Sequence, residues 1–325
     1  MNSKPDYPAI IDNSRASPEE RLAALARLAG EAEGFPKTGE VNNHIHTIYS
    51  FSPYTPSQAA LRARQAGLEA AGSVDHDSIA ASEEMIAACA LLGIGGCSGF
   101  EARVSFKTSA DGKPGPFGNR KINNPDSEGI AYMTVQGIPR PKIGAVREFL
   151  KPIQAQRRLR TQAMTARANE LLVPAGLEPV DFQQDVAGQS KAAEGGEITE
   201  RHLTAAIADK LILKYGKGAA LAEGVKTCFA VEPPAKTAAL LADPANPHYA
   251  YDLLGLLKSL FLPRVFIQPD ETECVPVKIV TDFANSIGAI PAYAYLGDVG
   301  ESPTGDKKAE QFEDAWLDEL FDELS

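Results

Sequence analysis

The chain has 325 residues, 44% of them apolar and 23% charged, which is enough for one large α/β domain or one domain with an insertion. Its net charge of −11 argues against binding a nucleic acid through bulk charge. No apolar run approaches the roughly 18 residues of a membrane span, and the N-terminus lacks an export signal, so we expect no membrane partner. The four cysteines form no C-x-x-C pair, which is typical of a reduced, cytoplasmic protein. Nothing here predicts an oligomeric state.

Two predicted helix starts frame the first predicted strand. Ser17-Pro18-Glu19-Glu20 is a capping box with proline at the first helical position, and it predicts a helix within an N-terminal extension over residues 1–39. A strand-like stretch then ends in His44-Ile45-His46. Thr55-Pro56-Ser57-Gln58 repeats the cap design and predicts a helix that ends at Gly67.

The next predicted elements alternate between strand and helix. Residues 68–74 are small and apolar, which favours a buried strand that delivers Asp75-His76-Asp77 at its C-terminal end. A helix starts near Ser82 with acidic residues in its first turn, and a strand over Ile94–Phe106 then carries Glu101. This rhythm is typical of a parallel sheet or barrel, in which ligands bind beyond the carboxyl ends of the strands.

The middle of the chain interrupts this rhythm. Residues 112–126 are rich in Gly, Pro and Asn, which predicts a long loop. Residues 141–263 then follow a helical pattern, so we expect a helical insertion between barrel segments over 40–140 and 264–325. We expect this insertion to cover the site as a lid.

Beyond the insertion the strand rhythm resumes. We predict a short strand over Arg264–Gln268, a helix over Val275–Ile287 and a strand over Ala289–Leu296. The final helix ends in acidic residues with no glycine after it, the reverse of what a helix C-terminus favours. We therefore expect a chain that is truncated at its C-terminus.

The residues at the first three strand ends have the chemistry of a metal site. A His-x-His pair on a strand places both imidazoles on one face, because side chains alternate with period two. His44, His46 and His76 offer imidazole ligands, and Glu101 offers a carboxylate that can bridge two cations. Two metals about 4 Å apart would lower the pKa of a bound water and stabilise both oxygens of an in-line displacement. Phosphate-ester hydrolysis fits that chemistry best.

These motifs resemble a known family. Three segments, which together cover about residues 40–106, are similar to the first motifs of the PHP (polymerase and histidinol phosphatase) family of metal-dependent phosphoesterases. They are His44-x-His46-Thr47 with Tyr49-Ser50, then Asp75-His76-Asp77, then Gly99-Phe100-Glu101. Weaker similarity lies near residues 264–297.

The resemblance implies a fold and a ligand set. The fold would be α/β, a distorted (β/α)7 TIM-like barrel, with two or three divalent metal ions (Zn, Mn or Fe) at the strand ends. The resemblance also implies that His44, His46 and Glu101 surround one ion and that Glu101 bridges to a second. It implies that His76 serves another ion, while Asp75 orients a ligand of the metal site from behind.

Departures from the family pattern lie in the rest of the site. Many relatives have Ser-Asp-Gly where this chain has Ser50-Phe51-Ser52, so an acidic ligand is absent there. Relatives often end a later strand in Ala-His-Pro, whereas this chain has Ala294-Tyr295-Leu296, followed by Asp298 as a candidate distant metal ligand. The family's final Asp-x-His motif has no match before Ser325, so either the last strands are missing or the site is incomplete.

Two further residues are candidates for catalysis. Arg103 lies two residues beyond Glu101 and should face the same way, so it can grip a phosphate in bidentate fashion or form a salt bridge to Glu101. His202 sits in the first turn of a predicted helix over Thr199–Tyr215, which resembles the helical insertion of PHP nucleotide phosphatases. It either reaches the substrate or packs at the edge of the helix.

The leading hypothesis is a metal-dependent hydrolase of the PHP type. It would cleave a phosphate ester of a small molecule or nucleotide by metal-activated water, so its partner would be a small phosphorylated substrate. One alternative is a catalytically degenerate barrel that binds metal or ligand without turnover. Another is a carbon–nitrogen hydrolase like the amidohydrolase barrels, although those usually carry a bridging lysine that is not evident here.

Overall fold

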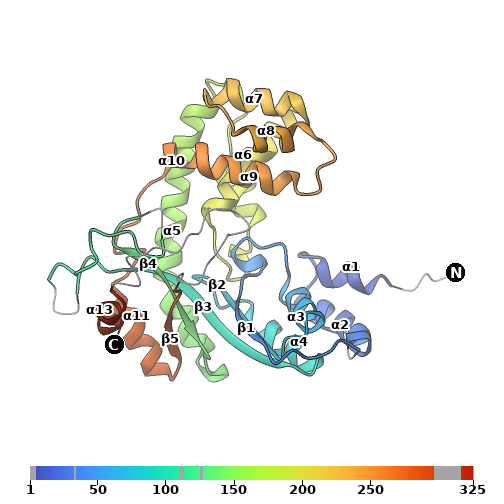
Figure 1. The fold of residues 1–325 in the computed structure, drawn as a ribbon, viewed down its shortest axis with the longest axis vertical. Coiled ribbons are helices and arrows are strands. Elements are labelled where there is room, and N and C mark those ends of the chain that lie inside the picture. Colours follow the sequence, from blue (N-terminus) through green and yellow to red (C-terminus); the bar gives the residue numbers. More distant parts are fainter. Residues whose placement is uncertain (1–4, 33, 110–112, 125–126, 296–315, 325) are drawn as a thin grey trace. The chain divides into compact units, whose positions relative to one another are not determined.

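Five strands form one sheet in the computed structural model, which describes residues 5–32, 34–109, 113–124, 127–295 and 316–324. Their order across the sheet follows the chain (Figure 1): β1 (Val41–Ile45), β2 (Ala70–His76), β3 (Gly95–Ser105), β4 (Ile130–Gln136) and β5 (Ile290–Tyr293). β1, β2 and β3 run parallel, whereas β4 runs antiparallel to both of its neighbours. The protein therefore has a mixed α/β fold with a curled, half-barrel sheet. The expectation of a parallel sheet is wrong at β4.

The chain divides into two units, and the first contains all of the described sheet. It comprises Met1–Gln154, Lys191–Glu197 and Asp270–Ser325. Its helices are α1 (Tyr7–Asp12), α2 (Pro18–Ala32), α3 (Pro56–Gln65), α4 (Ser82–Leu91), the first part of α5 (Ile143–Leu172), α11 (Val277–Ile287) and α13 (Leu317–Leu324). Its short 3-10 turns are η1 (Ile48–Ser50), η2 (Arg140–Lys142) and η5 (Ala192–Glu194). α11 lies beside β5 (Figure 1).

The two predicted helix starts are confirmed at α2 and α3. The Ser17 backbone N–H donates to Glu20 Oε2 at 2.8 Å, and the Glu20 N–H donates to Ser17 Oγ at 3.2 Å. At α3 the Gln58 backbone N–H donates to Thr55 Oγ1 at 3.1 Å. Gly67 follows α3 with a φ of 89°, and a Cβ there would lie 2.6 Å from the Pro36 carbonyl oxygen, so this turn requires glycine.

Two apolar clusters form the core of the first unit. One packs α1 to α4 against β2 and includes Ile11, Leu25, Ala60, Ala71 and Met85. The other packs α5 and α11 against β3 and β4, and includes Val135, Val146 and Val280. β3 contributes Phe100 and Val104 to this second cluster. Because side chains alternate along a strand, Glu101 and Arg103 face the opposite side of the sheet.

The second unit comprises Ala155–Ser190 and Ile198–Pro269 and contains helices but no strand, all of its residues being described. Its helices are the rest of α5, α6 (Glu200–Tyr215), α7 (Ala219–Phe229), α8 (Ala235–Ala242), α9 (Tyr249–Leu260) and α10 (Leu262–Val265), with short turns η3 (Phe182–Val186) and η4 (Ala187–Gln189). α6 packs against α9, and Leu203, Ile207 and Leu253 are buried there. Across the described residues, we find no helix with the length and apolar character that crossing a membrane requires.

The predicted short strand over Arg264–Gln268 is wrong. Leu262–Val265 forms α10, with Pro263 in its first turn, and residues 266–268 belong to no strand. Proline is well suited to that position because its ring fixes φ at a helical value and its missing N–H has no partner there in any helix. The predicted domain boundaries at residues 140 and 263 stay predictions, as does the lid role of the helical segment.

Candidate metal centre

Three adjacent parallel strands bring the candidate ligands together. His44 lies in β1 and His46 directly follows that strand, while His76 is the last residue of β2. The register of β2 and β3 places His76 opposite Glu101. Since the carboxyl ends of parallel strands share one edge of the sheet, local spacing in the sequence is enough to gather these four side chains.

All three histidines contact the carboxylate of Glu101. The distances are 3.2 Å from His44 Nε2 to Oε1, 3.7 Å from His46 Nε2 to Oε2, and 2.8 Å from His76 Nδ1 to Oε2. His44, His46 and Glu101 each offer one ligand atom, and these three atoms lie within 4.8 Å of one another. Among the described residues, this is the one group of three such side chains close enough to hold a metal ion. Imidazole nitrogens with a carboxylate oxygen suit Zn, Mn or Fe, so these residues fit a divalent ion.

Glu101 is the buried member of the cluster. Its side chain is 6% exposed, whereas the three histidine side chains are 26 to 37% exposed. Burial acts to raise the pKa of Glu101, but the charge of His76 and hydrogen bonds from His44 and His76 outweigh it and hold that pKa well below its usual range. Glu101 is therefore ionised at neutral pH, in the form that binds a cation.

Asp75 lies behind this cluster and organises the loop that follows β1. Its Oδ1 accepts the Thr47 backbone N–H at 2.6 Å and the Ser50 hydroxyl at 2.5 Å, and its Oδ2 accepts the Thr47 hydroxyl at 2.6 Å. Burial raises the pKa of Asp75, against the opposing effect of these hydrogen bonds from Ser50 and Thr47. Both carboxylate oxygens thus accept hydrogen bonds from the loop, in keeping with the orienting role that the resemblance implies.

Two non-glycine residues in left-handed conformations follow histidines of the cluster. Phe51 has a φ of 70° at the end of η1, and Asp77, directly after His76, has a φ of 46°. Each such conformation costs about 1–3 kcal/mol for a residue with a side chain. The backbone N–H of Asp77 donates to the Glu101 carbonyl oxygen at 2.7 Å, which ties the strained turn to β3. Backbone strain of this kind concentrates at functional sites.

Arg103 faces the same side of β3 as Glu101, as predicted, but its ion pair is with a residue that the sequence did not indicate. Its Nη2 lies 2.6 Å from Glu273 Oε1, and both side chains are buried. The predicted alternative, a salt bridge from Arg103 to Glu101, stays a prediction beside this pair. The role of Arg103 in gripping phosphate stays a prediction.

A second residue that sequence reasoning missed is Tyr132 on β4. Its ring centroid lies 5.6 Å from that of His76, and its backbone pairs with Arg103 across the β3–β4 ladder. The β-branched and aromatic residues of Ile130–Gln136 are the sequence feature that favours a strand there. Glu273 has no comparable indicator, because a short polar turn with several acidic residues normally lies in solvent.

Two predicted site residues remain, His202 and Asp298. His202 belongs to α6 of the second unit, where it is buried and its Nδ1 accepts the Thr199 backbone N–H at 3.0 Å in a capping box. Burial lowers the pKa of His202 to about 4, so the ring is neutral at pH 7. This contact gives His202 a structural role, and its catalytic role stays a prediction. Asp298 lies outside the described residues.

Comparisons with known proteins give distant likenesses. No protein-family model matches the chain, and no curated protein matches it. A solved structure from Bifidobacterium adolescentis, provisionally named a metal-dependent phosphoesterase, has 17% identity and a TM-score of 0.48 over 87% of this chain and 75% of that one. An amidohydrolase from Chromobacterium violaceum, with bound sulfate and no metal, has the same identity and TM-score over 87% of this chain and 74% of the other. Neither likeness carries an argument about the activity of this chain.

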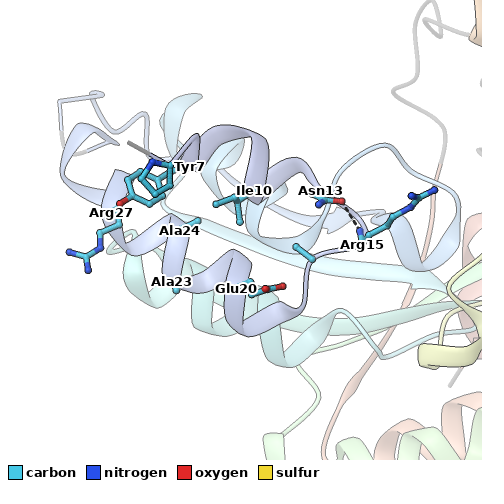
Figure 2. Close-up of a pocket in the computed structure, with 10 residues that line it drawn as sticks. Tyr7, Ile10, Asn13, Arg15, Glu20, Ala23, Ala24 and Arg27 are labelled. Atoms are coloured by element: carbon cyan, nitrogen blue, oxygen red, sulfur yellow. Dashed lines mark hydrogen bonds between the residues drawn. The ribbon is translucent and has the colours of Figure 1, made fainter. Parts of the chain in front are cut away.

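A cavity of about 550 Å³ lies at the N-terminal helices α1 and α2 (Figure 2). Its lining includes Tyr7, Ile10 and Ala24, and Figure 2 shows Arg15 and Arg27 toward opposite ends of it. None of the candidate ligands lines this cavity. The candidate metal ligands therefore belong to a different part of the structure from this cavity.

Proposed function

We propose that this protein is a metal-dependent hydrolase of the PHP type that cleaves a phosphate ester of a small molecule or nucleotide. The observation that carries the proposal is the convergence of His44, His46 and His76 on the buried carboxylate of Glu101 at the ends of three parallel strands. Three imidazoles around one ionised carboxylate have no packing function that apolar side chains would not serve better. The free-energy cost of removing these polar groups from water is offset if they bind a cation.

The residues of the cluster divide the work of holding divalent ions. His44, His46 and Glu101 would hold one ion, and His76, which contacts the same carboxylate, would serve a second ion bridged by Glu101. Bound ions of this kind supply Lewis acidity, lower the pKa of water and stabilise charge on phosphate oxygens. A third ion, with Asp298 as its ligand, stays part of the proposal.

The side chains around the cluster keep it in place. Asp75 orients the loop after β1, and the strained turn at Asp77 fixes the end of β2 against β3. Arg103 is held on the cluster's side of β3 by Glu273, where it would contribute positive charge for a phosphate if that pair opens toward the substrate.

The test combines metal content with turnover. Purified protein is analysed for bound Zn, Mn and Fe, and hydrolysis of p-nitrophenyl phosphate is followed with Mn²⁺ or Zn²⁺ added. The His44→Ala/His46→Ala double variant should lose both bound metal and hydrolysis. His248→Ala is the matched control, because His248 is an exposed residue of the second unit and should change neither. Equal hydrolysis by wild type and the double variant would overturn the proposal.

A second candidate function is metal or ligand binding without turnover. Two observations favour it: the single three-residue donor group among the described residues, and the buried Glu273 that already pairs with Arg103. Stoichiometry separates the candidates. Fewer than two ions per chain, with no hydrolysis of phosphate esters or of carbon–nitrogen substrates, would favour this degenerate site over the hydrolase.

A further inference from the structure

Ser50 joins the metal-ligand candidate His46 to the buried Asp75. Its Oγ lies 3.3 Å from His46 Nδ1 and 2.5 Å from Asp75 Oδ1. Ser50 is 4% exposed and Asp75 is 1% exposed, so bulk water has little access to either contact. The three residues thus form a chain that ends at the ring nitrogen opposite the one that faces Glu101.

Counting protons along this chain defines the tautomer of His46. The Ser50 hydroxyl has one proton, and an ionised carboxylate can only accept, so that proton lies toward Asp75. Ser50 Oγ must then accept from His46, which requires the proton of the neutral imidazole to be on Nδ1. We infer that Asp75 acts through Ser50 to hold His46 in the Nδ1–H tautomer, which leaves the lone pair of Nε2, on the side of Glu101, available to a cation.

The opposite arrangement of protons conflicts with the loop. It would need a proton on Asp75 Oδ1 so that Ser50 could donate to His46 instead. Oδ1 already accepts the Thr47 backbone N–H at 2.6 Å, and the Thr47 hydroxyl, which accepts the Tyr49 N–H at 3.3 Å, donates to Oδ2 at 2.6 Å. Donors therefore converge on both oxygens, and such contacts favour the carboxylate, in opposition to the burial that raises the pKa of Asp75.

The loop also prevents Ser50 from turning away. The Ser50 backbone N–H donates to the Thr47 carbonyl oxygen at 3.0 Å within η1, and the Tyr49 carbonyl accepts the Glu197 N–H at 2.8 Å. Ser50 and Asp75 are thus positioning residues for His46. The tautomer itself does not depend on the proposed metal site, but its effect on metal affinity rests on that proposed function. An imidazole whose second nitrogen already donates a hydrogen bond is a better oriented and more basic metal ligand.

Nuclear magnetic resonance of the full chain tests the tautomer directly. Long-range ¹H–¹⁵N spectra of the metal-free, ¹⁵N-labelled protein are recorded about two pH units above the ordinary histidine pKa of about 6.5, where imidazoles are neutral. With five histidines in the chain, His46 is assigned by the signal that His46→Gln removes. We expect His46 to carry its proton on Nδ1. A proton on Nε2 in the wild type would overturn the inference without any variant of Ser50.

Variants of Ser50 then test the relay. Ser50→Ala should release His46 into a mixture of tautomers and weaken Zn²⁺ binding by about 10–100-fold, the usual effect of losing such a partner. Ser50→Thr retains the hydroxyl and should restore the wild-type tautomer. Ser98→Ala is the matched control, since Ser98 is another buried serine, whose hydroxyl donates to the Ile138 carbonyl at 2.8 Å, and it should alter neither readout.

The outcomes separate this inference from the proposed function. An unchanged His46 tautomer in Ser50→Ala would overturn the relay even if the wild type binds Zn²⁺ tightly. Failure of the wild type to bind Zn²⁺ would overturn the proposed function, while the tautomer of His46 would still decide the inference. Equal Zn²⁺ affinity in wild type and Ser50→Ala would refute the positioning role.

Discussion

The Nδ1 atom of His76 lies 2.8 Å from the Oε2 atom of Glu101, at the point where β2 and β3 are in register. His44 approaches the other oxygen of the same carboxylate at 3.2 Å. Glu101 is therefore the shared acceptor of the cluster, and its ionised form is the one that these contacts stabilise. Removing its charge should affect the cluster more than removing any one histidine.

Glu101→Gln should abolish metal binding while preserving shape. An amide of the same size lacks the charge that attracts a cation, so we expect Zn²⁺ affinity to fall by more than about 100-fold, beyond the effect of losing an outer partner. At Zn²⁺ concentrations about 100 times the wild-type dissociation constant, the wild type should gain about 2.7 kcal/mol in the free energy of unfolding, and the variant should gain less than about 0.4 kcal/mol.

Thermal unfolding with and without Zn²⁺ measures this difference. Glu178→Gln is the control, because Glu178 is exposed in the second unit, and its Zn²⁺-dependent shift should match that of the wild type. A Glu101→Gln protein that Zn²⁺ stabilises as much as the wild type would show that the carboxylate is not a ligand.

The sequence predicted the part of the site that local spacing controls. His44 and His46 share a strand, and His76 and Glu101 end and line the next two strands, so period-two alternation and parallel pairing bring them together. The contact between Glu273 and Arg103 depends instead on where a turn that is distant in the sequence passes beside β3. Because Arg103 and Glu273 are 170 residues apart, no local pattern links them.

The same distinction explains the fold. Caps such as Ser17–Glu20 predict helix starts because donors and acceptors within four residues satisfy each other. The direction of β4 depends on the long segment before it, which returns the chain so that Ile130 pairs with Ser105. An antiparallel return needs no intervening helix. The alternation of helix and strand that predicted β2 and β3 therefore does not predict the direction of β4.

Arg21→Met should destabilise the first unit strongly. Arg21 Nε and Nη2 contact the two carboxylate oxygens of Glu84 at 2.8 and 2.6 Å, and Arg21 is completely buried. Removing one partner leaves Glu84 charged inside the protein, which typically costs about 3–5 kcal/mol. Urea unfolding of the variant measures the loss.

The neighbouring surface pair provides the control for this prediction. Arg147 contacts Glu83 at 2.8 Å, and both side chains are about half exposed, so Arg147→Met should cost less than about 1 kcal/mol. The Arg21→Met/Glu84→Leu double variant should recover much of the lost stability, because no charge is left buried. Equal losses for Arg21→Met and Arg147→Met would contradict this account.

Ala230→Gly should stabilise the second unit. Ala230 ends α7 with a φ of 52° and is exposed, so its methyl group bears the steric cost of a left-handed conformation without burying surface. Glycine avoids that cost, and we expect a gain of about 1 kcal/mol in the free energy of unfolding. Ala239→Gly, the same change inside α8, should instead lose about 0.5–1 kcal/mol. Changes of the same sign at both positions would contradict the prediction.

His202 should make the second unit sensitive to acid. Its pKa is about 4 in the folded chain and about 6.5 when unfolded, so between these values the unfolded chain holds a proton that the folded chain lacks. Its contribution to stability is therefore complete above about pH 6.5 and is lost as the pH falls toward 4, by about 3 kcal/mol in total. Urea unfolding at intervals between about pH 7 and pH 4 should show this loss.

His202→Gln isolates the effect, because glutamine is a natural capping-box residue at the third helical position and does not titrate. We expect the variant to keep the cap on Thr199 and to lose less stability than the wild type on acidification. His248→Gln makes the same change at an exposed histidine and should leave the pH dependence as it is in the wild type. If His202→Gln and the wild type lose stability in parallel over this range, then the buried ring of His202 is not the group that takes up the proton on unfolding.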